Sequence, residues 1–176
     1  MTAALGFLTV RHHAEHGYFG GYLVVNEMAR PLEFQCTMAV RPSRAQEVLY
    51  GPTLEDFVCG EQIAAALLSK GKVKPDLCLT DCRPVLALAQ VSKYSIGYVR
   101  PVEDQHRSLR TPAESRLQTR AVDFAAIEIE CLESRVPPSD ALSNLSSAVH
   151  PSFDFEEPFL RIVEALEEAH PITKAA

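Results

Sequence analysis

The sequence predicts an α/β domain (α+β) in which a mixed sheet, led by a β-hairpin, packs against helices. The chain has 176 residues, of which 47% are hydrophobic, and this is enough to bury one core without disulfides. Residues 32–40 alternate strictly between two sets of side chains, which is typical of an antiparallel strand. Within residues 54–80, apolar side chains at helical spacing are followed by a short apolar run, which is typical of a helix followed by a buried strand.

The hairpin is expected in the N-terminal quarter of the chain. Residues 5–10 form a first strand, and the Gly-containing residues 12–21 form a loop or an irregular, bulged strand. Residues 22–25 form the next strand, and a turn over 26–31 leads into the strand 32–40. The alternation puts five residues on the expected core face of that last strand, namely Leu32, Phe34, Cys36, Met38 and Val40.

A helix is expected to begin at Gly51-Pro52-Thr53, where Thr53 can cap it, and to end near Lys70 because Gly71 follows. Leu77–Thr80 lacks polar alternation, which favours a strand buried inside the sheet. Residues 83–91 can form a short helix, since proline is tolerated in a first helical turn. Residues 94–99 resemble another strand.

The C-terminal third carries weaker signals. Residues 126–132 alternate between apolar and polar side chains, which favours a strand, and a helix is the alternative. The Ser- and Pro-rich residues 134–155 indicate a surface connection. Residues 158–169 carry apolar side chains at helical spacing. We therefore expect one α/β domain over 1–133, a connection over 134–155, and an acidic helix over 156–170 that packs on the same domain.

The charge distribution argues against a nucleic-acid partner. Residues 1–120 carry 14 basic and 12 acidic residues, whereas residues 121–176 carry 3 and 11. Only one segment could form a basic stripe that binds phosphates, and it also contains acidic residues and lacks aromatic residues that could stack on bases. Its arginines are Arg100, Arg107, Arg110, Arg116 and Arg120. We expect these arginines to be solvated or paired within the chain.

The sequence also predicts a cytoplasmic protein with no membrane segment. No apolar run approaches the roughly 20 residues that cross a bilayer, and the short run at residues 3–10 has no basic residue before it. The five cysteines are odd in number and lie mostly in apolar surroundings, which favours reduced thiols.

Two carboxylates are candidate catalytic residues. On a helical wheel of about 100° per residue, Glu61 falls within the apolar stripe of the 54–70 helix. A carboxylate there needs a partner or a proton, so Glu61 is either a general acid/base or metal ligand, or a structural partner of an arginine. Asp81 follows the buried strand at the end where ligands gather in such sheets, or else it caps the next helix.

Residues 57–67 resemble the active-site helix of cytidine deaminases, in which a Cys or His, one residue and a Glu open a helix behind a β-hairpin. In this chain those positions are Cys59-Gly60-Glu61. The sequence Cys82-Arg83-Pro84-Val85 is similar to the end of the second zinc motif of that family. The resemblance covers about residues 20–90. It implies a deaminase-like fold, zinc held by Cys59 and Cys82, and Glu61 as the proton shuttle of a zinc-activated water.

Two further patterns give alternatives. The element order also suits a ribonuclease-H-like fold, in which Glu61 and Asp81 would be two of the acids that hold metal ions. His12, His13 and His16 lie beside Glu15, a group that either binds a metal or forms an exposed loop.

Two functions follow from these residues. The first is a non-catalytic binding or assembly protein, whose contact surface is an edge of the hairpin sheet or the acidic C-terminal helix and whose partner is another protein or a second copy. The alternative is a metal-assisted hydrolase or deaminase-like enzyme centred on Glu61, Asp81 and Cys82. The chain lacks the complete nucleophile-elbow and phosphate-loop motifs, and this favours the first function.

Overall fold

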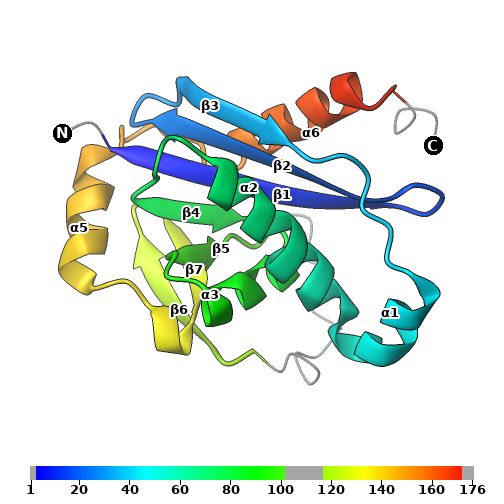
Figure 1. Cartoon of the computed structure of the whole chain (residues 1–176). Coiled ribbons are helices and arrows are strands. Elements are labelled where there is room, and N and C mark those ends of the chain that lie inside the picture. Colours follow the sequence, from blue (N-terminus) through cyan, green and yellow to red (C-terminus); the bar gives the residue numbers. More distant parts are fainter. Residues whose placement is uncertain (1–2, 102–116, 172–176) are drawn as a thin grey trace.

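A seven-stranded mixed sheet forms the centre of the computed structural model, which describes residues 3–101 and 117–171 (Figure 1). The strand order is β3-β2-β1-β4-β5-β7-β6. Strand β1 pairs parallel with β4, and β4 pairs parallel with β5, whereas the other neighbours pair antiparallel. The bounds are β1 (Ala4–His13), β2 (Gly17–Asn26), β3 (Pro31–Cys36), β4 (Leu77–Thr80), β5 (Ile96–Tyr98), β6 (Thr119–Phe124) and β7 (Ile127–Leu132). The predicted α/β class is confirmed.

Helices cover both faces of this sheet (Figure 1). One core cluster joins the sheet to the helical segments on either side of β4 in the chain, and a second joins it to the C-terminal helices. The first group comprises η2 (Asp56–Ala64), α2 (Ala65–Lys70), η3 (Arg83–Ala87) and α3 (Leu88–Val91). It is preceded in the chain by α1 (Arg44–Tyr50) and η1 (Gly51–Thr53), which contain no buried residues. The second comprises α5 (Ser139–Ala148) and α6 (Glu157–Ala169), preceded by the short turn η5 (Glu133–Arg135).

None of the helices in the described part of the chain is long and apolar enough to cross a membrane.

The first hairpin is longer than predicted. β1 and β2 pair over their whole length, from Ala4 with Asn26 to His13 with Gly17. Of the two predictions for residues 12–21, the loop is therefore wrong outside the turn at 14–16, and the strand is confirmed, although without a bulge. Two glycines in β2 explain the close packing there. A Cβ on Gly20 would lie 2.2 Å from Ile63 of η2, and one on Gly21 would lie 2.3 Å from Ile162 of α6. Gly20 and Gly21, which suggested a loop in the sequence, therefore allow the helices on both faces to approach the sheet.

The strand at 32–40 is confirmed in part, as β3, but its apolar face is not a core face. Leu32 is 48% exposed, Phe34 40% and Met38 78%. β3 is the last strand on its side of the sheet, and Phe34 lies beside Leu23, at the border of the core beneath α6. The alternation identifies which side chains share a face, but nothing in the described structure covers that face enough to bury it.

The expected helix over 51–70 is three consecutive segments, η1, η2 and α2. A capping box occurs earlier than predicted, at Ser43 and Gln46, and it begins α1. Thr53 does not cap a helix, because its hydroxyl donates to the Tyr50 carbonyl at 2.7 Å. Gly71 does follow the last helical residue, as predicted.

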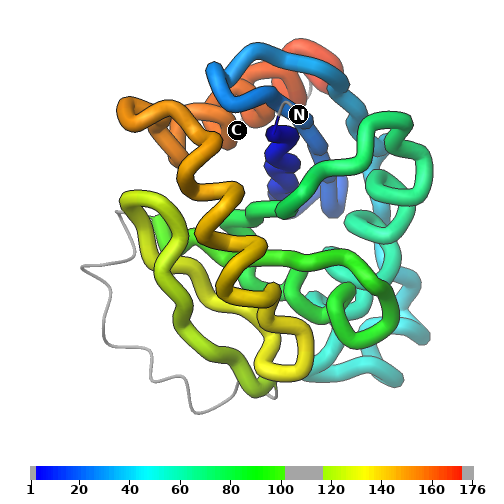
Figure 2. Tube along the Cα trace, turned by 90° about the vertical axis from the view of Figure 1, so that its left-hand side faces the viewer, coloured from blue at the N-terminus to red at the C-terminus, as the bar shows by residue number. Residues whose placement is uncertain are grey.

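The buried strand β4 has the predicted bounds, and α6 matches the predicted C-terminal helix to within a residue. β6 was not predicted, and the expected irregular connection is wrong over α5 (Figure 2). Leu142 and Leu145 are buried on one face of α5, and this burial outweighs the low helix preference of its serines. The helix packs in the same core cluster as α6.

Candidate functional site

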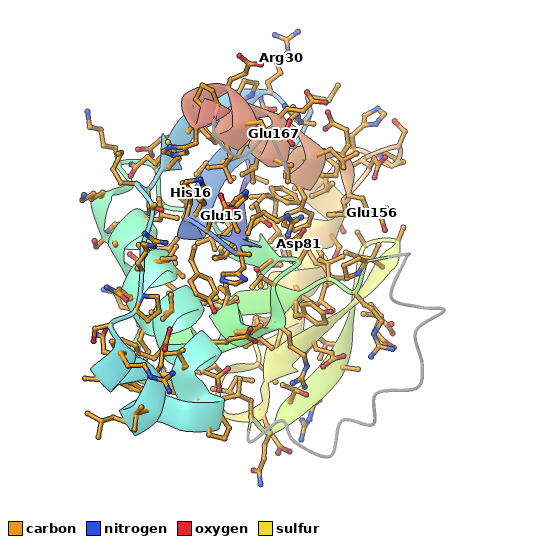
Figure 3. The ribbon with its side chains drawn as sticks, turned by 90° about the vertical axis from the view of Figure 1, so that its right-hand side faces the viewer. Glu15, His16, Arg30, Asp81, Glu156 and Glu167 are labelled. Atoms are coloured by element: carbon orange, nitrogen blue, oxygen red, sulfur yellow. The ribbon has the colours of Figure 1, made fainter. Side chains whose placement is uncertain are left out.

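Asp81 lies directly after β4, beside the part of β1 that continues beyond the β1–β4 pairing (Figure 3). The parallel register pairs Leu8 with Thr80, which places the following residues of both strands next to each other. The Asp81 carboxylate accepts a hydrogen bond from the Thr9 hydroxyl at 2.6 Å and forms an ion pair with Arg11 at 2.7 Å. Thr9 is fully buried, and the Asp81 side chain is 10% exposed. Asp81 therefore ties the end of β4 to the middle of β1.

The predicted alternative for Asp81, a helix cap, is wrong. The residue at the N-cap of η3 is Cys82, and no side chain caps that helix. The Cys82 N–H donates instead to the Thr80 hydroxyl at 3.1 Å. Pro84 lies in the first turn of η3, as predicted.

Glu61 is exposed, so the prediction that it lies within a buried apolar stripe is wrong. The reason is the helix type. Residues 56–64 have π-helical hydrogen bonding from residue i to i+5, which turns through less than the 100° per residue that the wheel assumed. In the described part of the chain, no hydrogen bond or ion pair joins the Glu61 side chain to Asp81 or to either thiol of the predicted zinc site.

Cys59 and Cys82, in contrast, come together. Cys59 lies near Cys82, and this neighbouring thiol, followed by burial, raises the pKa of the Cys59 thiol far above its ordinary value. Cys59 is only 3% exposed, and Cys82 is half-buried against the same core. Cys59 lies on η2 and Cys82 lies at the start of η3, 23 positions later in the sequence.

Tyr18 borders this pair of thiols. Burial raises the pKa of its phenol above the ordinary value, and the negative charge of Glu55 and the nearby Cys59 raise it further. The Tyr18 ring lies 4.4 Å from the ring of His12, measured between centroids. Sequence reasoning missed Tyr18, because no spacing rule connects β2 with residues 59 and 82.

The described residues do not fit a catalytic zinc ion. Such a site needs three protein ligands and an open position. Residues 3–101 and 117–171 contain no group of three or more His, Cys, Asp or Glu side chains that could hold a metal ion. The histidine group at the β1–β2 turn also falls short, although the rings of His13 and His16 lie 4.7 Å apart.

The arginines of the predicted basic stripe that the structure describes are paired within the chain. Arg100 lies 3.0 Å from Glu130, and Arg120 lies 3.1 Å from Glu133. Arg107, Arg110 and Arg116 lie outside the described residues. The intramolecular pairing agrees with the expectation that charge here serves the fold.

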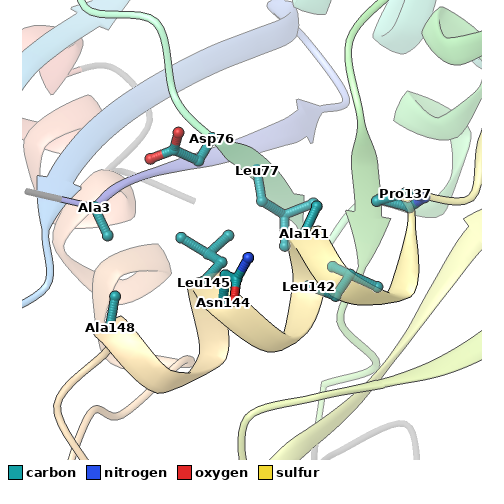
Figure 4. A pocket seen from close by; sticks show the side chains of 9 residues that line it. All are labelled: Ala3, Asp76, Leu77, Pro137, Ala141, Leu142, Asn144, Leu145 and Ala148. Carbon is teal, nitrogen blue, oxygen red and sulfur yellow. The ribbon is translucent and has the colours of Figure 1, made fainter. Parts of the chain in front are cut away.

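A cavity of about 400 Å³ lies between α5 and the start of β1 (Figure 4). Its lining is aliphatic apart from Asp76 and Asn144. The Asp76 carboxylate accepts the Ala4 N–H at 2.9 Å, so it is occupied in holding the start of β1. The carboxylate of this cavity thus serves the fold.

Compared with models of protein families and with curated proteins, the sequence matches none of them.

Proposed function

We propose that this chain is a non-catalytic assembly protein that binds a second copy of itself through the edge strand β3. The observation that carries the proposal is the exposed apolar stripe of that strand, formed by Leu32, Phe34 and Cys36. Exposed apolar side chains on an unpaired sheet edge are a template for pairing with another strand.

The backbone of β3 supports strand addition. Thr37 donates its N–H to the Gly20 carbonyl of β2 at 2.9 Å. Because antiparallel strands alternate the direction of their hydrogen-bonding groups, the N–H and C=O of Phe34 and Cys36 point away from β2. An added strand would therefore find donors and acceptors beside an apolar surface.

A second copy of β3 matches this edge in charge as well as in polarity. In an antiparallel pair centred on Phe34, the two Phe34 residues face each other and Leu32 faces Cys36 of the other copy. On the opposite face, Glu33 faces Gln35 of the other copy, so no two like charges are directly opposed. The pairing is two-fold symmetric, and this closes the assembly at a dimer.

Glu33 fixes the position of β3 in the fold. Its carboxylate accepts the backbone N–H groups of Lys72 and Val73 at 2.9 and 2.8 Å. These two hydrogen bonds lower the pKa of Glu33, with Val73 contributing most. The Glu33 carboxylate is therefore charged at neutral pH, and it connects β3 to the segment before β4.

Sedimentation equilibrium of the full chain and of Phe34→Glu tests the proposal. We expect the unaltered chain to sediment as a dimer and Phe34→Glu as a monomer, because two carboxylates would face each other across the pair. At ~1–3 kcal/mol for the lost apolar burial alone, the dissociation constant should rise by a factor of about five to one hundred.

Leu160→Glu is the matched control. Leu160 is 63% exposed on α6, so this change adds the same charge to an exposed apolar position outside β3. It should leave the dimer intact. A monomer for the unaltered chain at every concentration, or equal dissociation by both variants, would refute the proposal.

A further inference from the structure

The cavity between α5 and the start of β1 takes no part in the proposed assembly, and its two sides differ in polarity (Figure 4). Leu77, Leu142 and Leu145 are buried and form its apolar part. Asp76 is exposed and lies across the cavity from α5. A volume of about 400 Å³ is in the range of small-molecule sites, which are mostly apolar with a few polar groups that orient the ligand.

Small side chains on α5 leave this cavity open. Ala141, Leu145 and Ala148 recur at intervals of four and three residues, so they lie on one face of the helix. Ala141 and Ala148 are exposed, whereas Leu145 between them is buried. The helix therefore lines the cavity with one leucine between two alanines, whose side chains are single methyl groups.

Two hydrogen bonds fix the position of Asp76. Its backbone N–H donates to the Ala4 carbonyl at 2.8 Å, and its Oδ2 accepts the Ala4 N–H at 2.9 Å. An ionised carboxylate can accept about four hydrogen bonds, so Oδ2 can hold β1 while Oδ1 accepts from a ligand. Among the lining side chains of the described structure none is basic, and the other polar one, Asn144, is neutral. The negative charge of Asp76 is therefore not balanced within the lining.

We infer that this cavity binds a small aliphatic amine as its ammonium cation. The ammonium group donates to Asp76 at the exposed side of the cavity, and the alkyl chain lies against the leucines. An ammonium group has only donors and a carboxylate only acceptors, so the two match in hydrogen bonding as well as in charge. An alcohol of the same length gains the apolar contact without the ion pair.

Two trends in affinity follow from this arrangement. Each methylene group added to the amine should tighten binding about fourfold until the chain fills the cavity, because it moves from water to an apolar surface. The ammonium group should add about two- to fivefold over the hydroxyl of the matching alcohol, since an ion pair with an exposed carboxylate is weak. The leucines thus supply most of the affinity, and Asp76 supplies the selectivity.

The test is to titrate the full chain with n-hexylamine, n-butylamine and n-hexanol and to follow the NMR chemical shifts of the backbone amides. We expect saturable shifts within residues 76–77 and 139–148. The affinity for n-hexylamine should exceed that for n-butylamine about fifteenfold and that for n-hexanol about two- to fivefold. Asp76→Asn keeps an acceptor for the Ala4 N–H and should remove the preference for the amine over the alcohol.

A second variant fills the cavity. Ala141→Leu places a larger side chain there, at an exposed helical position that should tolerate it, and should abolish saturable binding of all three compounds. Ser143→Leu is the matched control, because Ser143 is exposed on α5 but does not line the cavity. It should bind all three compounds as the unaltered chain does.

Four results would overturn the inference. With the unaltered chain, they are the absence of saturable shifts with n-hexylamine, and equal affinity for n-hexylamine and n-hexanol. With folded variants, they are a preference for the amine that persists in Asp76→Asn, and unchanged binding by Ala141→Leu. The first two do not depend on whether any variant folds. None of these results bears on the dimer, whose contact lies on β3.

Discussion

Phe159→Ala is expected to lower the free energy of unfolding by about 3–5 kcal/mol, the usual loss when a buried phenylalanine leaves a cavity. Phe159 is 4% exposed on α6, and its ring lies 5.2 Å from that of Phe7 in an edge-to-face arrangement. Phe7 is fully buried in β1, at the centre of the sheet. The substitution removes both the apolar contact and the aromatic pair.

The measurement is urea unfolding followed by circular dichroism, with all proteins at one concentration because dimerisation would add to apparent stability. Leu160→Ala is the control, since Leu160 is the next residue on α6 but is 63% exposed. It should change the free energy of unfolding by less than about 0.5 kcal/mol. Equal small effects for both variants would show that α6 does not pack on the sheet as described.

Asp81→Ala is expected to lower the free energy of unfolding by about 1–3 kcal/mol, because it leaves the buried Thr9 hydroxyl without an acceptor. Asp81→Asn keeps an acceptor oxygen and should restore most of this loss. Thermal and urea unfolding of the two variants give the comparison directly.

Arg11→Ala separates the hydrogen bond from the ion pair. Arg11 is 47% exposed, so its ion pair with Asp81 should contribute only about 0–1 kcal/mol. If Asp81→Ala were as mild as Arg11→Ala, the carboxylate would not be a structural tie between β1 and β4. Asp81 would then again be a candidate catalytic residue.

Much of the sheet could be predicted because buried strands have a recognisable pattern of apolar residues in the sequence. The apolar run Leu77–Thr80 could only be stable with neighbours on both sides, and β4 indeed lies between β1 and β5. The residue after such a strand is placed by the strand's end, so Asp81 was correctly expected just past the C-terminal end of β4.

The failures have equally local causes. Alternation grouped Leu32 and Phe34 on one face of a strand, but whether a face is covered depends on the order of strands, which the pattern does not contain. The wheel misplaced Glu61 because it assumed an α-helix where residues 56–64 form a π-helix. No local pattern could predict that Cys59 and Cys82 lie near each other, since this depends on how η2 and η3 pack.

The central claim, pairing of β3 with β3 of a second copy, is tested most directly by cross-linking. In the proposed register, residue 32 of one chain faces Cys36 of the other, with Cα atoms about 5.5 Å apart, a separation that a disulfide can bridge. Leu32→Cys under mild oxidation should therefore give a covalent dimer with bonds between positions 32 and 36. Leu160→Cys should not form bonds to Cys36. Monomers only, or cross-links that Leu160→Cys forms equally well, would contradict the account.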